Sequence, residues 1–166
     1  MSKPNRLMKL VNATEKLPNN VRTFLLSKAF GQFVPLVGTA GLHYDYVSQH
    51  KVIVSIKNHR AVQNHIKGVH AAAMALLVET ATGFVTVLNV PDHRILLIKS
   101  LHVDYLKVAQ GNLTATATLS DEHIKFITET EKGELEIPVT VIDDAGQSPI
   151  QCKMVWAWLP KKRKQS

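Results

Sequence analysis

Residues 64–89 read NHIKGVHAAAMALLVETATGFVTVLN, and this stretch decides the fold. The segment Ala71–Val78 is entirely apolar, so a helix here has no polar side to turn toward water. A helix that is apolar all round is normally enclosed by the rest of the protein. The sequence therefore predicts a central helix from about His70 to Leu88, roughly 28 Å long at 1.5 Å per residue.

This helix carries one formal charge, Glu79, between His70 and Asp92. The stretch is too short and too interrupted for a membrane span, which needs about 20 unbroken apolar residues. Buried carboxylates are usually either paired with a cation or functional. We interpret Glu79 as functional, and a structural carboxylate paired with Lys, Arg or His is the alternative.

The composition indicates one domain with a substantial core, because 45% of the 166 residues are hydrophobic. The lone Cys152 excludes an intramolecular disulfide framework and favours a reducing compartment. The first residues lack the apolar run of a secretory signal, so we expect a cytoplasmic protein without membrane insertion. The net charge of +7 favours an anionic partner, but no nucleic-acid-binding motif accompanies it, so we expect no nucleic acid.

The chain is expected to have three parts: a helical extension over residues 1–38, a main domain over 39–160, and a solvated basic tail over 161–166. From residue 39 the hydrophobic period becomes two, which is typical of strands. Segment 121–131 fits either state. In the strand at 94–105, one face is expected to carry Leu97, Leu101, Val103 and Tyr105. The predicted strands are 42–46, 52–56, 94–105, 113–119, 135–142 and 150–159.

One long apolar helix and about six strands joined by short turns predict an α+β protein with an antiparallel sheet. The sheet needs cover on one face, and the helix is the only element apolar enough to provide it. We therefore expect a strongly curved sheet wrapped around the central helix. The many small residues of the helix allow strands to approach it closely.

Two stretches of the sequence resemble a known protein family. The pattern N-x-x-x-G-x-H-A-A-A-x-x-x-L-x-E-T-A, from Asn64 to Ala81, resembles the active-site segment of hotdog-fold acyl-CoA thioesterases, especially the phenylacetate-degradation thioesterase clade. The stretch HVDYLKVAQGNLTATATL (residues 102–119) is similar to that family's paired strands. The family has His-Gly-Gly where this chain has His70-Ala-Ala, which resembles a less characterised thioesterase-like branch. The resemblance covers roughly residues 39–159.

The resemblance implies a hotdog fold and a site shared between two subunits. The acid comes from one subunit, and the amide-rich start of the central helix comes from its partner. Nine residues of helix separate His70 from Glu79, about 13 Å, which is too far for both to hold one carbonyl within one chain. The implied catalytic residues are Glu79, Asn64 and His70. The implied substrate-binding residues are Gly68, Ala71, Ala72, Thr80 and Lys107.

Several of these residues have structural alternatives. For Asn64 the alternative is a bond to the backbone of its own loop, as Asn often makes at turns. His70 is favoured as a cap or packing residue whose backbone is the useful part. Thr80 inside a helix more often bonds the carbonyl four residues earlier. The spacing of the histidines at 59, 65 and 70 matches no common zinc pattern, so we expect no metal.

The function that these residues favour is hydrolysis of acyl-CoA to a free acid and coenzyme A, with Glu79 as base or nucleophile. The alternative is a hotdog protein that binds acyl-CoA or acyl chains without turnover. Hotdog dehydratase motifs and the G-x-S-x-G elbow of serine hydrolases are both absent from the sequence. No cofactor is expected beyond the coenzyme A of the substrate.

We expect a homodimer or a dimer of dimers, because pairing edge strands across a twofold axis removes an exposed edge. The candidates to bind the phosphates of coenzyme A are basic residues near the helix: Lys99, Lys107, Lys67 and Arg60.

Overall fold

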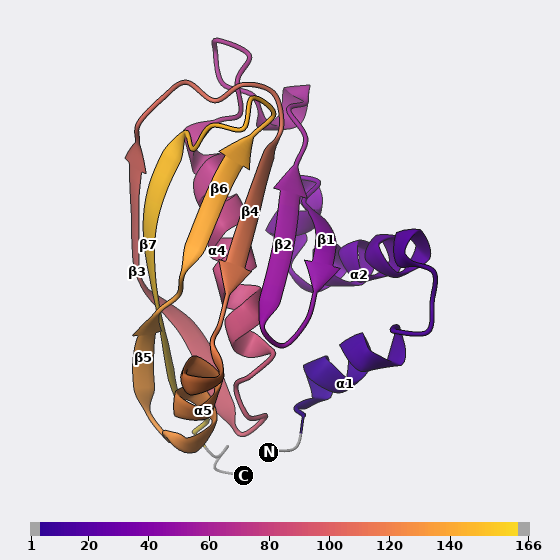
Figure 1. The fold of residues 1–166 in the computed structure, drawn as a ribbon, viewed down its shortest axis with the longest axis vertical. Helices are drawn as coiled ribbons and strands as arrows, with labels where there is room; N and C mark the ends of the chain where they lie inside the picture. Colours follow the sequence, from indigo (N-terminus) through magenta and orange to yellow (C-terminus); the bar gives the residue numbers. More distant parts are fainter. Residues whose placement is uncertain (1–3, 163–166) are drawn as a thin grey trace.

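The computed structural model describes residues 4–162, and a single long helix, α4 (Ala71–Val87), runs through its centre (Figure 1). The prediction of a helix over residues 70–88 is confirmed. His70 is the N-cap, with an extended backbone (φ −62°, ψ 143°), and its ring Nδ1 accepts a hydrogen bond from the Ala72 N–H at 3.0 Å. Leu88 ends the helix, and the side chain of Asn89 donates to the carbonyl of Val85.

Within residues 4–162, seven antiparallel strands curve around one side of this helix. Four of them form a sheet in the order β1-β2-β4-β6: β1 (His43–Val47), β2 (Lys51–Ile56), β4 (Leu113–Thr118) and β6 (Val139–Asp143). Three others pair in the order β3-β7-β5: β3 (Arg94–Tyr105), β7 (Ile150–Pro160) and β5 (Gly133–Glu136). The amide of Ile137 donates to the carbonyl of Met154 at 2.9 Å, which links the two sheets into one curved layer.

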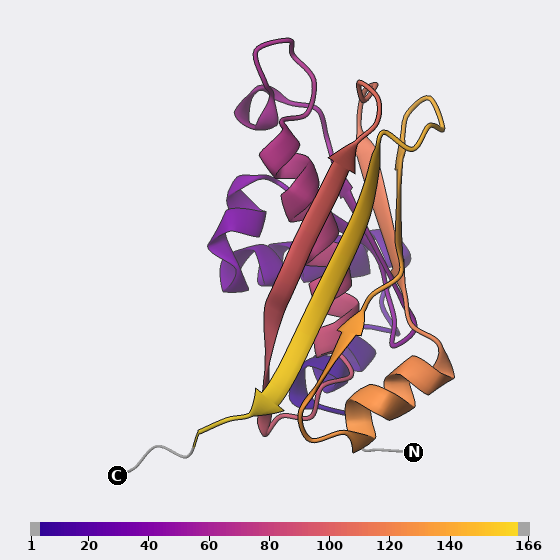
Figure 2. The same cartoon turned by 90° about the vertical axis from the view of Figure 1, so that its left-hand side faces the viewer.

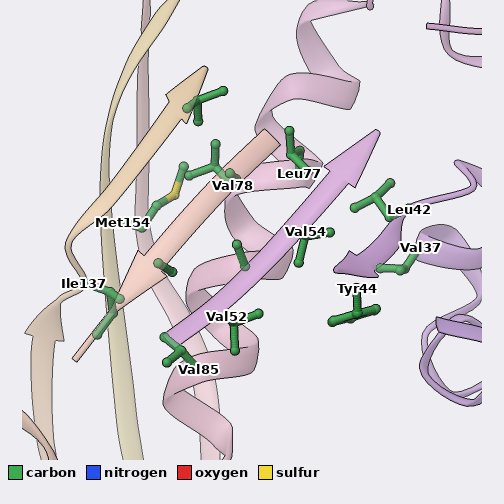
Figure 3. Close-up of a cluster of buried hydrophobic side chains, with 14 of the residues drawn as sticks. Val37, Leu42, Tyr44, Val52, Val54, Leu77, Val78, Val85, Ile137 and Met154 are labelled. Atoms are coloured by element: carbon green, nitrogen blue, oxygen red, sulfur yellow. The ribbon is translucent and has the colours of Figure 1, made fainter. Parts of the chain in front are cut away.

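The core lies between this layer and α4. The inner residues of β2 (Val52, Val54 and Ile56) are completely buried. Figure 3 shows Val52 and Val54 beside Leu77, Val78 and Val85 of α4. The inner residues of β4 are Leu113, Ala115 and Ala117, also completely buried. The small alanines allow β4 to lie close to the helix, as the wrapped arrangement requires. The predicted α+β architecture is therefore confirmed.

One glycine permits another close approach. A methyl group built on Gly83 of α4 would lie 2.5 Å from the ring of Trp156 in β7. The indole N–H of Trp156 donates to the hydroxyl of Thr82 at 2.9 Å, which fixes the ring against the helix. Gly83 therefore sets the distance between α4 and β7.

Two predicted strand faces are wrong, in both cases because of a β-bulge. The register between β3 and β7 shifts between Ile98 and Ser100, so Leu97 lies on the outer face, opposite to Leu101 and Tyr105. In the first strand, the alternating pattern places Leu42, Tyr44 and Tyr46 on one face. A register shift in β1 between Tyr44 and Tyr46 leaves Tyr46 exposed, whereas Leu42 and Tyr44 are buried. One extra residue reverses the alternation of every side chain that follows it. A strict two-residue pattern cannot anticipate this reversal.

The chain between β4 and β6 also differs from prediction. The predicted strand over 135–142 is divided into β5 and β6, with Pro138 between them, because proline cannot donate to a ladder. The undecided segment 121–131 contains a helix, α5 (Asp121–Glu129), which is capped by the side chain of Ser120. The guanidinium of Arg94 donates to the carbonyls of Ile127, Thr128 and Thr130 at the carboxyl end of α5.

Residues 4–39 contain three helices: α1 (Arg6–Ala13), α2 (Asn19–Phe33) and α3 (Pro35–Thr39). They lie on the side of α4 that the sheet leaves open (Figure 2). Phe30 of α2 and Val37 of α3 join the common core. The division of the chain at residue 38 stays a prediction. In the predicted basic tail over 161–166, residues 163–166 lie outside the described range.

The outer edge of β1 is covered by α2. The Tyr44 amide donates to the Ser27 hydroxyl at 2.8 Å, and the Arg22 guanidinium donates to the Val47 carbonyl at 3.0 Å. Two backbone groups of this edge strand are thus bonded by helix side chains. At the other end of the layer, β3 pairs with β7 and has no further neighbour within residues 4–162.

Candidate functional site

The loop before α4 is held by the side chain of Asn64. Its Oδ1 accepts hydrogen bonds from the amides of Ile66 and Gly68, each at 3.0 Å. Its backbone amide donates to the Gly68 carbonyl at 2.9 Å. Lys67 adopts a left-handed conformation (φ 63°) inside this closed loop. The geometry thus gives Asn64 the structural role that the sequence left open, through its Oδ1.

The start of α4 offers one amide that is not used within the described chain. The His70 N–H donates to the Val62 carbonyl at 2.8 Å, and the Ala72 N–H donates to the His70 ring. The amides of Ala73 and Met74 donate to the His70 carbonyl. The Ala71 N–H has no acceptor within residues 4–162, and Ala71 is exposed. The His70 N–H is thus already used within the chain, and the Ala71 N–H is the available donor at this helix start.

A small cleft of about 160 Å³ lies beside this amide. The Tyr105 hydroxyl, at the end of β3, donates to the Ala71 carbonyl at 2.9 Å and forms one wall. The cleft brings together four of the predicted site residues: Asn64, Gly68, Ala71 and Lys107. It does not include His70, Ala72, Glu79 or Thr80.

Glu79 lies two turns further along α4 and is half-buried. Burial raises the pKa of its carboxyl above the ordinary value. Its negative charge contributes, after burial, to the raised pKa of the Tyr44 hydroxyl, so the two groups are close. No ion pair within residues 4–162 includes Glu79, so the structural alternative of a paired carboxylate finds no partner in this part of the chain.

The side of α4 that carries Glu79 is the least covered part of the helix. Ala72, Leu76 and Glu79 share this side by their helical spacing, and none of them is fully buried. Further along, Phe84 packs against Phe30 and Tyr44, with ring centroids 4.3 and 4.8 Å apart. The N-terminal helices therefore cover the later turns of α4 and leave the side with Ala72, Leu76 and Glu79 partly accessible.

Thr80 is buried, with 6% of its surface exposed, and its hydroxyl has no hydrogen-bond partner in the described chain. The expected bond to the carbonyl four residues earlier is not made, whereas Thr82 and Thr86 do make such bonds. A buried hydroxyl without a partner is unusual, because leaving it unsatisfied lowers stability. The residue next to Glu79 thus holds an uncommitted polar atom.

The surroundings of the cleft are basic. The sequence contains no Asp or Glu between Asp45 and Glu79, whereas Lys57, Arg60 and Lys67 are exposed there. The ammonium group of Lys107 bonds the Gln147 side chain at 2.8 Å at the edge of the cleft. Lys99 instead pairs with Glu134 of β5 and is less available for a ligand.

Sequence reasoning missed two contacts of this site. Tyr105 belonged to the similar strand stretch, but its bond to the helix start is a tertiary contact without a local signal. The same applies to Tyr44, which approaches Glu79 from β1.

Within residues 4–162 no three His, Cys, Asp or Glu side chains are grouped to hold a metal. No helix in this range combines the length and the apolar character that crossing a bilayer requires.

Comparison with known proteins places this geometry in a family. Residues 22–159 match the family described as a domain of unknown function, DUF4442. The chain belongs to this family. A search of curated proteins finds no match to this DUF4442 chain. The matched residues include most of α2 and all of the curved sheet except Pro160, and they exclude α1.

Solved structures show that the DUF4442 chain has the hotdog fold of thioesterases. A Pseudomonas aeruginosa protein of unknown function, described as a probable thioesterase, has a TM-score of 0.74 at 19% identity, over 84% of this chain and 96% of that one. A Haemophilus influenzae thioesterase has a TM-score of 0.66 at 11% identity, over 84% and 94%. A Staphylococcus aureus thioesterase variant has a TM-score of 0.64 at 19% identity, over 76% and 99%.

Proposed function

We propose that this protein hydrolyses acyl-CoA thioesters at a site formed between two copies of the chain. One subunit contributes the carboxylate of Glu79, and the other contributes the Ala71 N–H at the start of α4. Seventeen residues form α4, and the eight-residue interval from Ala71 to Glu79 corresponds to about 12 Å. That interval is too long for both groups of one helix to act on a single carbonyl, which supports a site between subunits.

The observation that carries the proposal is the raised pKa of Glu79 without a pairing cation in residues 4–162. A carboxylate whose pKa is raised toward neutrality is a stronger general base at neutral pH than an ordinary one. Glu79 takes a proton from water as the water oxygen attacks the thioester carbonyl carbon. The carbon–sulfur bond then breaks, and the proton passes to the leaving thiolate. The products are a carboxylic acid and coenzyme A.

The carbonyl oxygen becomes negatively charged as the water attacks. The Ala71 N–H can donate to this oxygen, and the positive potential at the start of α4 stabilises the same charge. A backbone N–H is a donor whatever the side chain of its residue. Ala71 therefore keeps this function, although the hotdog thioesterases that the sequence resembles have glycine at this position. The hydroxyl of Thr80, which has no partner in the described chain, is a candidate to orient the attacking water.

Two further observations support the site. The solved Staphylococcus aureus thioesterase structures include a Gln-to-Ala and a Glu-to-Ala variant at positions fifteen residues apart, the interval that also separates Asn64 from Glu79 here. The basic surroundings of the cleft suit the phosphates of coenzyme A, with Lys67, Arg60 and Lys107 as candidate contacts.

The dimer is proposed on the basis of β3. Its free edge is unpaired in residues 4–162, and its inner face leaves Ile98, Leu101 and Tyr105 between 39% and 50% exposed. An apolar edge strand of this length is normally covered by another chain. The shared site requires that pairing two such edges across a twofold axis also bring the accessible sides of two α4 helices together.

The test is an assay of thioester cleavage with thiol detection over acyl-CoAs of increasing chain length. We expect turnover by the native chain and none by Glu79→Gln, with the fold unchanged in circular dichroism. Undiminished turnover by Glu79→Gln contradicts the proposal. Saturable acyl-CoA binding without turnover by the native chain would instead identify a non-catalytic acyl-CoA-binding protein.

A further inference from the structure

The outer side of α2 is apolar and is not covered by any element within residues 4–162. Val21, Phe24 and Leu25 are between 40% and 56% exposed, and their helical spacing places them opposite the buried Leu26 and Phe30. The apolar surface continues from the end of α2 onto α3. We call it the α2–α3 face, and its members, each between 40% and 85% exposed, are Val21, Phe24, Leu25, Phe33, Val34 and Leu36. Clustered exposed apolar side chains mark a surface that binds another molecule.

The α2–α3 face lies far from the edge through which we propose that two chains pair. Figure 1 shows α2 beside β1, whereas β3 is on the opposite side of the molecule, and each of these strands is the last one of its sheet. Pairing through β3 would therefore leave the α2–α3 face uncovered. The cleft beside Ala71 includes no residue of α2 or α3, so the face is also separate from the proposed reaction site.

The charge around the α2–α3 face is positive. Residues 16–44 contain Lys16, Arg22 and Lys28 but neither Asp nor Glu. The Lys28 ammonium lies 6.0 Å from the centre of the Phe24 ring, so a cation lies at the apolar surface itself. Two copies of the face would bring like charges together, which disfavours self-association through it. The charge therefore favours an anionic partner.

The shape of the face favours a lipid surface over an acidic protein. Phe33 is 85% exposed, so its ring projects from the molecule instead of filling a pocket. A projecting ring can enter the boundary between lipid headgroups and acyl chains, while lysines beside it attract anionic headgroups. Such a contact lies in the plane of the membrane surface and requires no spanning helix. We infer that the α2–α3 face binds the surface of an anionic membrane, with Phe24 and Phe33 at the lipid boundary and Lys28 at the headgroup phosphates.

The test is co-sedimentation of the full chain with sucrose-loaded vesicles. Binding to vesicles of equal parts phosphatidylcholine and phosphatidylglycerol should be at least tenfold stronger than binding to phosphatidylcholine alone. It should weaken as salt is added, because salt screens the attraction between lysines and headgroups. Equal binding to the two kinds of vesicle, or binding to neither, overturns the proposal.

Two pairs of apolar substitutions locate the contact. Phe24→Gln combined with Phe33→Gln should weaken binding to the anionic vesicles at least tenfold, with an unchanged circular dichroism spectrum because both side chains are exposed. The matched control combines Leu97→Gln with Ile142→Gln, on β3 and β6, where the native side chains are 50% and 48% exposed. This control should bind as the native chain does. Undiminished binding in the Phe24 and Phe33 variant, or equal losses in both variants, contradicts a membrane contact at this face.

A pair of charge reversals separates the local charge from the net charge. Lys28→Glu should weaken binding to the anionic vesicles at least fivefold. Lys125→Glu makes the same change on α5, where Lys125 is also exposed, and should not weaken binding. Equal effects of the two reversals would show that only the net charge matters, which contradicts a defined binding face.

Two further measurements distinguish other partners. In light scattering without lipid, the native chain and the Phe24 and Phe33 variant should have the same mass. A lower mass of the variant would identify the face as an interface between copies of the chain and overturn the proposal. Poly-L-glutamate, at the same concentration of negative charge, should not displace the protein from the anionic vesicles. Full displacement would identify an acidic polypeptide as a sufficient partner and overturn the preference for lipid.

Discussion

Two substitutions at opposite ends of the proposed reaction test whether its groups come from different subunits. Ala71→Pro removes the Ala71 N–H. Proline is favoured at the first position of a helix, and the extended backbone of His70 (ψ 143°) already suits a following proline, so the fold should persist. Loss of one oxyanion donor should lower kcat by about 10²–10³-fold. Glu79→Gln removes the base and keeps the side-chain volume.

The decisive measurement uses dimers assembled from two differently tagged chains. A dimer of one Ala71→Pro chain and one Glu79→Gln chain has one site with both native groups, since the first chain supplies Glu79 and the second supplies the amide. We expect about half of the native turnover per dimer, although each parent homodimer is nearly inactive. The matched control places both substitutions in one chain and pairs it with a native chain. Each of its two sites then lacks one group, so it should be nearly inactive.

The opposite pattern refutes the reasoning. If the acid and the amide act within one chain, the dimer with both substitutions in one chain keeps half of the activity and the other dimer has none. If Ala71→Pro alone retains full kcat with unchanged helicity, the Ala71 N–H does not stabilise the reacting carbonyl. A monomer in light scattering at assay concentration also contradicts a shared site.

Three further changes test the electrostatics and packing. Burial raises the folded-state pKa of Glu79, so the ionised carboxylate destabilises the fold at pH values above the ordinary carboxyl range. Glu79→Gln should therefore raise Tm at those pH values. In thermal melts this gain should disappear as the pH falls below about 4. Asp143 accepts hydrogen bonds from backbone N–H groups, which lower its pKa, so its contribution to stability should be present above about pH 4 and be lost as the pH falls through the folded-state pKa. In denaturant titrations, Asp143→Ala should have a lower free energy of unfolding than the native chain, and this difference should shrink in acid. A difference that does not depend on pH contradicts this. Gly83→Ala should lower the free energy of unfolding by about 2 kcal/mol through its clash with Trp156, and a gain of stability would show that the ring moves aside.

The sequence predicted the central helix because Ala71–Val78 has no polar side, and the structure places its boundaries within one residue of the expected ones. The curved sheet followed from the period-two segments and the need to cover that helix. The bulges at Asp45 and Lys99 were not predictable, because an inserted residue looks like any other in an alternating pattern. The helix α5 was also undecided, since its stability includes bonds from the distant Arg94.

The candidate site was predicted in part. The spacing of Asn64, Gly68 and Ala71 is local, and the loop and helix start bring these residues to one cleft. Which amide remains available could not be read from the sequence, because it depends on Val62 and on the orientation of the His70 ring. The proximity of Tyr44 to Glu79 likewise depends on how β1 lies against α4.

The two ends of the curved layer differ in a way that limits assembly. At β1, the side chains of Ser27 and Arg22 in α2 already bond two of the backbone groups that another strand would need, the Tyr44 N–H and the Val47 carbonyl. At β3 the backbone groups of the last strand have no such cover in the described chain. A molecule in which only one of the two edge strands is free to pair can join a single neighbour through its strands. Strand-to-strand growth would then stop at two chains, which protects an apolar β-rich protein against fibre formation.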